Sequence, residues 1–131
     1  MDNIGLIVIT ALAVIFVAPY LYMKVSAVRA VGKPVPVENL NVSTDKNIDK
    51  SCYVYFMSQT CSSCKKMTPI IKQLNLVNPG TVIIDINQTP ELANDFHVYG
   101  TPTLMEIKQG LIKKVKLGNL SENKIKQFLD Q

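Results

Sequence analysis

Two cysteines separated by two serines are the residues with the clearest chemistry in this chain. Cys61-Ser-Ser-Cys64 follows a short apolar run and precedes a segment with helical periodicity. Cys61 is therefore expected at a helix N-terminus, where unpaired N–H groups and the helix dipole favour a thiolate. Cys64 would lie one turn further on, where it can form a disulfide with Cys61 and resolve a mixed disulfide. The pattern predicts thiol–disulfide exchange, and because the cysteine pair itself carries the electrons, no cofactor is expected.

The same spacing also occurs in zinc sites, which need two further ligands. Only Cys52 and His97 remain for that role, and they form no second close pair, so no metal is expected. Copper(I) binding by the thiolates is another alternative, disfavoured by the lack of a second histidine or a methionine-rich site. We expect Cys52 to be a small buried residue, with a regulatory or intermolecular thiol as the alternative. His97 is expected on the surface.

Alternating strand and helix patterns surround the cysteine pair. Strands are expected at residues 52–57, 81–86, 103–107 and 111–117, and helices at residues 62–76, 89–96 and 122–129. Thr89 and Ser121 are the expected N-caps of the last two helices, and Pro69 predicts a kink in the first. This order favours an α/β fold with a mixed sheet between helices, in which the hairpin pairs antiparallel.

The N-terminal segment differs in composition from the rest of the chain. Residues 4–23 carry no charge, and 20 helical residues rise about 30 Å, the thickness of a bilayer's hydrocarbon core. Tyr20 and Tyr22 lie at one end, where amphipathic rings favour the membrane interface. We expect a short N-terminal end (1–3), a transmembrane helix (4–23), a linker (24–36) and a folded domain (37–131).

Two alternatives to a transmembrane helix remain. A cleaved signal sequence would use the small residues at 25–27 but lacks a basic n-region. A buried core helix is disfavoured by the length and the absence of charge.

Charge favours one side of the membrane for the domain. No Lys or Arg precedes the apolar run, whereas Lys24, Arg29 and Lys33 follow it, so the positive-inside bias predicts a cytoplasmic domain in a single-pass protein of a bacterial inner membrane. An extracytoplasmic domain stays open. The net charge of +4 is too mild and scattered to predict nucleic-acid binding.

From Cys52 onward, about 80 residues, the chain resembles the thioredoxin superfamily. The resemblance rests on the strand entering C-x-x-C, Pro69 five residues after Cys64, the Val82-Ile-Ile-Asp85 strand, Gly100-Thr-Pro-Thr103 and Gly118 after the last strand. It implies that Cys61 attacks, that Cys64 resolves and that the Thr101–Pro102 bond is cis. It also implies that Thr60, Thr101 and Pro102 contact substrate, with the Thr101 backbone pairing with an extended strand.

The chain departs from the superfamily pattern around the cysteines. Thr60 replaces the usual Trp, Ser62-Ser63 replaces Gly-Pro, and Tyr55 and Thr81 replace a buried Asp and its Lys partner. Without that Asp, Cys64 has less help in losing its proton, so slower resolution is expected. Only residues 34–50 are available for the superfamily's first strand and helix, which are expected to be shortened.

These observations predict a membrane-tethered thiol–disulfide oxidoreductase, acting as a reductase. Protein thiols or disulfides are the expected substrates, and a redox partner protein would restore the cysteine pair. The departures motivate one alternative, a redox-inactive accessory or binding subunit of a membrane complex.

Overall fold

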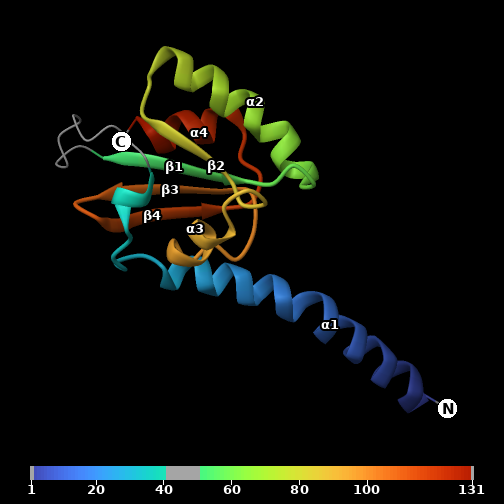
Figure 1. The fold of residues 1–131 in the computed structure, drawn as a ribbon. Helices are drawn as coiled ribbons and strands as arrows, with labels where there is room; N and C mark the ends of the chain where they lie inside the picture. The colour runs from blue at the N-terminus through green and yellow to red at the C-terminus, as the bar shows by residue number, and fades with distance from the viewer. Residues whose placement is uncertain (1, 41–50, 131) are drawn as a thin grey trace.

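The chain alternates strands and helices after one long N-terminal helix (Figure 1). The computed structural model describes residues 2–40 and 51–130. The helices are α1 (Asp2–Arg29), α2 (Ser62–Val77), α3 (Pro90–Asp95) and α4 (Glu122–Leu129), with a 3-10 turn η1 (Val37–Leu40); the strands are β1 (Cys52–Met57), β2 (Thr81–Asp85), β3 (Thr103–Lys108) and β4 (Leu111–Leu117). The α/β prediction is confirmed, and every domain element from β1 onward lies within one residue of its predicted bounds.

The four strands form one mixed sheet in the order β2-β1-β3-β4. β1 and β2 pair in parallel because α2 carries the chain back between them, whereas β3 pairs antiparallel with both β1 and β4. The β3–β4 hairpin turns through Gln109 and Gly110, both with positive φ (55° and 71°), as a two-residue hairpin requires. Helices α2 and α4 cover one face of the sheet, and α3 and the end of α1 lie across the other (Figure 1).

The side chains of β1 point alternately to the two faces of the sheet and pack into a separate hydrophobic core on each face. Tyr55 packs with Met67 and Phe128 beneath α2 and α4. Val54 and Phe56 point the other way, and the Phe56 ring lies 5.5 Å from that of Phe96. Because both faces of β1 are buried, the position of its carboxyl end, where the cysteines begin, is firmly fixed.

Helix α1 is longer than the predicted membrane span. It continues unbroken through Arg29, so the first six residues of the expected linker (24–36) are helical. The reason is packing: Ala30 and Val35 are buried in the core, and the intervening backbone bonds to the exposed edge of β4. Gly32 N–H donates to the Ile112 carbonyl at 2.8 Å, and Ile112 N–H donates to the Lys33 carbonyl at 3.0 Å.

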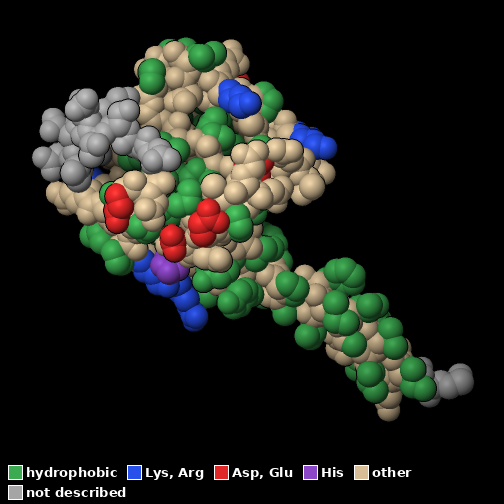
Figure 2. Space-filling model, in the orientation of Figure 1, with side chains coloured by type: hydrophobic (Ala, Val, Ile, Leu, Met, Phe, Trp, Pro, Cys, Tyr) green, Lys and Arg blue, Asp and Glu red, His purple; other side chains and the backbone are tan. Residues whose placement is uncertain are grey.

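Among the described residues, none packs around the first part of α1. An 18-residue window of this helix is 0% buried and is apolar and long enough to cross a membrane. Figure 2 shows hydrophobic side chains along the visible length of α1. This exposure excludes the alternative of a buried core helix.

The expected short first strand and helix fall on residues 34–50, of which residues 41–50 lie outside the described part of the chain. In the described part, Pro34 forms an isolated bridge with Leu111, and η1 follows it. The predicted N-caps do not cap through their side chains. The Thr89 hydroxyl instead donates to the Asp85 carbonyl at 3.3 Å, closing the loop after β2.

Candidate active site

The cysteine pair lies where β1 gives way to α2. Cys61 is the N-cap of α2, with extended backbone (φ −82°, ψ 115°), and its Sγ accepts the N–H of Cys64 at 3.1 Å. The two residues form a disulfide with their Cα atoms 5.2 Å apart. Cys61 is half-buried, whereas Cys64 is 0% exposed. One sulfur is therefore within reach of a second molecule, and the other lies behind it.

The loop before β3 meets the same sulfur. The Thr101 carbonyl oxygen lies 3.5 Å from Cys61 Sγ, and the Thr101–Pro102 peptide bond is cis, as the superfamily resemblance implied. Thr103 Oγ1 donates to the Gly100 carbonyl at 2.7 Å, which tightens the turn. The structure thus brings the pair Cys61 and Cys64 together with Thr101 and Pro102, some 40 residues further along the sequence.

A polar hub that the sequence analysis missed holds the loop between β1 and Cys61. The Ser58 hydroxyl, 5% exposed, lies 3.0 Å from Thr60 Oγ1 and accepts Asn87 Nδ2 at 2.9 Å. Thr60 is exposed, but its hydroxyl is turned toward Ser58. The available signal was a serine directly after a buried strand, but Asn87 comes from the loop after β2 and cannot be matched to it by local pattern.

Asp85, at the end of β2, supports the same loop. Its carboxylate accepts Gln59 Nε2 at 2.8 Å and the backbone N–H of Asn87 at 3.0 Å. Asp85 therefore holds Gln59, the residue after Ser58, and Asn87, which bonds to the Ser58 hydroxyl, so both the loop before Cys61 and its support are fixed from the end of β2.

Tyr55 occupies the position of the superfamily's buried Asp. It is 0% exposed, and its hydroxyl lies 3.0 Å from Thr68 Oγ1 on α2. Burial raises the pKa of Tyr55 above its ordinary value of 10.0, although the Thr68 hydrogen bond acts in the opposite direction. Tyr55 is therefore neutral near pH 7 and supplies no base to the neighbouring helix.

A shallow cavity of about 340 Å³ lies beside the site, between the end of β1 and α2. Its lining includes Ser58, Gln59, Lys65 and Lys72. Lys65 and Lys66 are exposed, and Lys65 places its positive charge at this cavity one turn beyond Cys61. Such charge favours an anionic sulfur or an acidic segment of a partner.

The remaining cysteine and the histidine lie away from this site. Cys52 is half-buried at the start of β1, rather than fully buried as predicted, because that end of the strand lies at the edge of the core. His97 has a positive φ of 55° and lies at the surface, as predicted, but is partly covered. Burial first, and the charge of Lys33 second, lower its pKa, while Asp95 acts in the opposite direction. Within residues 2–40 and 51–130, no three His, Cys, Asp or Glu side chains gather to hold a metal ion.

A mixed four-stranded sheet that presents a C-x-x-C disulfide at a helix N-terminus, against a cis-proline loop, defines the thioredoxin-like class of protein. Residues 35–131 match the family described as Thioredoxin, and the chain belongs to that family. It is 29% identical over 99 residues to thioredoxin of Chlorobaculum thiosulfatiphilum (68% of this chain, 92% of the relative) and 30% identical over 88 residues to thioredoxin 2 of Chlorobaculum tepidum (65% and 81%).

Solved structures show the same fold. The X-ray structure of Fasciola hepatica thioredoxin superposes with a TM-score of 0.61 at 25% identity, covering 72% of this chain and 88% of that one. The crystal structure of reduced Schistosoma mansoni thioredoxin pre-protein superposes with a TM-score of 0.60 at 24% identity, covering 72% and 87%. The chain is a thioredoxin-like thiol–disulfide oxidoreductase, and its domain matches these thioredoxins over most of their length.

Proposed function

We propose that this chain is a membrane-tethered reductase of protein disulfides, in which Cys61 attacks and Cys64 resolves. The observation that carries the proposal is the unequal burial of the two sulfurs at the start of α2. Cys61 is half-buried and faces the Thr101 carbonyl, whereas Cys64 is fully buried. Only the first can meet a disulfide on another protein without unfolding of the helix.

The reaction begins from the dithiol form. The Cys61 thiolate, stabilised by the N-terminus of α2, attacks one sulfur of the substrate disulfide. The substrate S–S bond breaks, one substrate sulfur leaves as a thiolate that takes up a proton, and the other stays bound to Cys61. Cys64 then loses its proton and attacks Cys61 Sγ, which releases the second substrate thiol and leaves the Cys61–Cys64 disulfide. Two electrons have moved to the substrate, and a redox partner protein must return two electrons to the cysteine pair.

The loop around Cys61 is suited to an extended protein segment. The Thr101 carbonyl lies against the sulfur, and the Thr101 backbone can add a substrate strand beside it. Thr60, which is exposed, directly precedes Cys61 in the chain. Because Tyr55 supplies no base, we expect the resolving step at Cys64 to be slower than in thioredoxins that carry a buried Asp there.

The apolar surface of α1 supports a membrane tether. Its first 22 residues include large hydrophobic side chains that are about half to three-quarters exposed, such as Ile4 (72%) and Phe16 (73%). A continuous apolar surface of this kind needs lipid or a partner to cover it. Cleavage at residues 25–27 would remove Tyr22 and Met23, which contact the domain, so these contacts favour a retained anchor. Lys24, Arg29 and Lys33 favour a cytoplasmic domain, where a reductase would receive electrons.

Insulin reduction by the full chain in lipid nanodiscs tests the activity. With dithiothreitol as electron donor, the wild-type chain should accelerate the precipitation of insulin, and Cys61→Ser should fall to the uncatalysed rate. Cys52→Ser is the matched control and should retain the wild-type rate, because Cys52 lies at the far end of β1. Equal rates for wild type and Cys61→Ser would overturn the proposal.

The side of the membrane needs a separate measurement. In intact cells that express the full chain, a membrane-impermeant maleimide should leave the reduced Cys61 unlabelled until the membrane is opened. Labelling before that step would place the domain outside the cytoplasm and would point to an oxidising or isomerising role.

A further inference from the structure

The end of the predicted membrane span touches the loop that carries Thr101. The ring of Tyr22 packs edge-on against that of Tyr99, with centroids 6.1 Å apart. Met23 Sδ would lie only 3.0 Å from a Cβ atom added to Gly100. The absence of a side chain at Gly100 therefore makes room for the last residue of the span.

This contact places Cys61 close to the end of the span. Gly100 is followed by Thr101, whose carbonyl oxygen lies 3.5 Å from Cys61 Sγ. The path from Met23 Sδ to Cys61 Sγ consists of these two contacts, one Cα–Cα step of about 3.8 Å, and about 4 Å of covalent structure within Gly100 and Thr101. The two sulfur atoms are therefore at most about 15 Å apart. In Figure 1, α2 begins on the side of the domain toward which α1 projects, which agrees with this placement.

The connection between the span and the domain is stiff. Helix α1 is continuous through Arg29, and the following residues bond to the edge of β4. Val35 N–H, the last of these contacts, donates to the Gly110 carbonyl at 2.9 Å. The domain therefore cannot swing freely on an extended linker, and the orientation of its active site follows that of α1.

Both the end of the predicted span and the neighbouring loop of the domain carry exposed tyrosines. Tyr20 and Tyr22 on α1 are 54% and 63% exposed, and Tyr99 on the domain is 50% exposed. Tyrosine favours the membrane–water interface, where its ring meets lipid and its hydroxyl meets water. The headgroup layer adds about 5–8 Å on each side of the hydrocarbon core. With Met23 at the boundary of the core, Cys61 lies within about 15 Å of that boundary, a distance comparable with the thickness of the headgroup layer.

We propose that the active site faces the membrane surface and acts on disulfides of membrane proteins that lie at the level of the lipid headgroups. This inference rests on the proposed tether and deepens it by naming the substrate class. A disulfide held far from the bilayer, on a distant part of a folded domain, would not reach Cys61 while α1 spans the membrane.

The height of the sulfur above the bilayer is measured with a fluorescent label and a lipid quencher. Bimane is attached to Cys61 in the full chain with Cys52→Ala and Cys64→Ala, and nanodiscs carry a phospholipid with a spin-labelled headgroup. The matched control is Val77→Cys in a chain whose three native cysteines are replaced. Val77 is exposed at the other end of α2, 16 residues and about 24 Å along the helix.

We expect quenching of the Cys61 label to be at least about threefold stronger than that of the Val77→Cys label, since the two positions differ by about 24 Å along α2. Equal quenching, or stronger quenching at Val77→Cys, overturns the inference. A third label, at Val14→Cys, separates this from failure of the tether. If a spin label on the lipid acyl chain quenches the label at Val14→Cys, but the headgroup spin label does not quench the label on Cys61, the tether holds and the proposed orientation is wrong. If Val14→Cys is not quenched, both the tether and the inference fail.

The substrate class is tested with two lipid-anchored peptides that carry the same disulfide. One places the disulfide directly after the lipid, and the other places it beyond a helical spacer of about 20 residues, or about 30 Å. The wild-type chain should reduce the near disulfide about tenfold faster than the far one, as expected for a site held at the surface. Equal rates, with insulin reduction intact, overturn the inference and leave the proposed function standing. No reduction of insulin or of either peptide would overturn both.

Discussion

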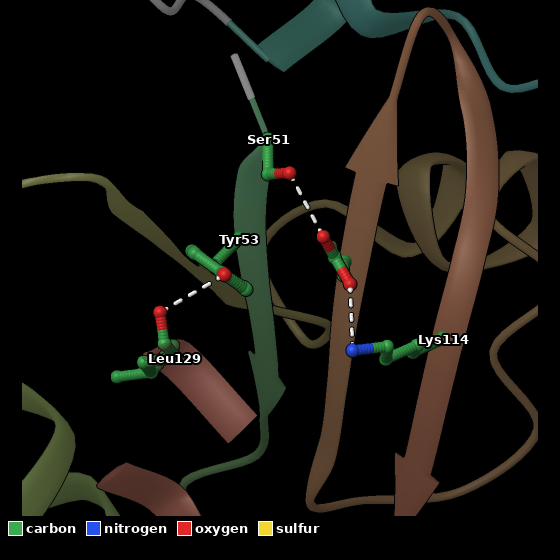
Figure 3. A network of polar contacts seen from close by, with 5 residues as sticks. Ser51, Tyr53, Lys114 and Leu129 are labelled. Atoms are coloured by element: carbon green, nitrogen blue, oxygen red, sulfur yellow. Dashed lines mark hydrogen bonds and ion pairs between the residues drawn. The ribbon is translucent and has the colours of Figure 1, made fainter. Parts of the chain in front are cut away.

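The two ends of β1 both carry polar and sulfur-bearing residues, but they are built for different purposes. At the start of the strand, Ser51 Oγ donates to Glu106 Oε1 at 2.8 Å, and Lys114 Nζ lies 3.5 Å from Glu106 Oε2 (Figure 3). Tyr53 there donates to the Leu129 carbonyl at 3.0 Å. At the other end, the Ser58 hub positions a half-buried sulfur that faces outward.

Glu106 and Cys61 differ in whether their reactive or charged atoms are fully bonded inside the fold. Glu106 is 6% exposed and has a partner on each carboxylate oxygen, so its charge is stabilised inside the fold. Cys61 holds an atom that exchanges partners, and the surrounding bonds fix its position without enclosing it. The first end stabilises the fold, and the second presents a reactive atom.

The two cysteines that flank β1 give the largest expected contrast. In the reduced chain at neutral pH, iodoacetamide should alkylate Cys61 roughly 10–100 times faster than Cys52, because the N-terminus of α2 favours a thiolate only at Cys61. Time-resolved peptide mass spectrometry measures both rates in one sample. Comparable rates would show that the position at the helix N-terminus does not activate Cys61.

Glu106→Gln should break the stabilising end without touching the reactive one. Losing the ion pair with Lys114 and a charge-assisted bond should lower the free energy of unfolding by about 1–3 kcal/mol. Glu122→Gln is the matched control, because Glu122 pairs with Lys126 on the exposed surface of α4, and such a pair contributes about 0.5 kcal/mol or less. Chemical denaturation measures both, and insulin reduction should be unchanged in both. Equal destabilisation by the two variants would contradict the account of the Glu106 network.

A pair of Tyr→Phe variants sharpens the comparison. Tyr53→Phe and Tyr55→Phe each remove one neutral hydrogen bond of 3.0 Å, so each should cost about 1 kcal/mol of stability. Because Tyr55 stays neutral, Tyr55→Phe should change the rate of insulin reduction no more than Tyr53→Phe does. A tenfold slower rate in Tyr55→Phe alone would show that its hydroxyl assists Cys64.

His97, away from both ends of β1, gives the smallest expected effect. Its pKa is lowered in the folded chain by burial and by Lys33, so below about pH 6.5 the unfolded chain binds more protons than the folded one. Stability is therefore complete above that pH and falls as the pH drops toward the lower folded value. His97→Asn keeps a residue that tolerates the positive φ, and the loss of thermal midpoint from about pH 7.5 to 5.5 should be smaller than in the wild type. An equal loss in both chains would assign the pH dependence to other groups.

Local pattern was enough to predict the domain's strands and helices. Apolar runs such as residues 52–57 and the two-residue hairpin turn carry their own signals, so the bounds agree to within one residue. The cysteine pair was equally clear, because its spacing and its place before a helix are both local. Cys61 and Thr101 were linked only through the superfamily resemblance, since their contact joins residues 40 positions apart.

Features that depend on packing between distant segments were missed. The bond from Asn87 to Ser58 joins two loops, and nothing in either loop identifies the other. The packing of the expected linker was missed for the same reason. Its first residues continue α1, and Ala30 and Val35 are buried against a sheet edge that the sequence does not display.

Trapping of a mixed disulfide tests the central claim, that Cys61 attacks and Cys64 resolves, most directly. The full chain with Cys64→Ser, reduced and held in nanodiscs, is mixed with oxidised insulin and then examined by non-reducing electrophoresis and mass spectrometry. The account predicts an accumulating adduct joined through Cys61, and no adduct when Cys61→Ser replaces Cys64→Ser. An adduct through Cys64 in the Cys61→Ser chain, or through Cys52 in either, would contradict it.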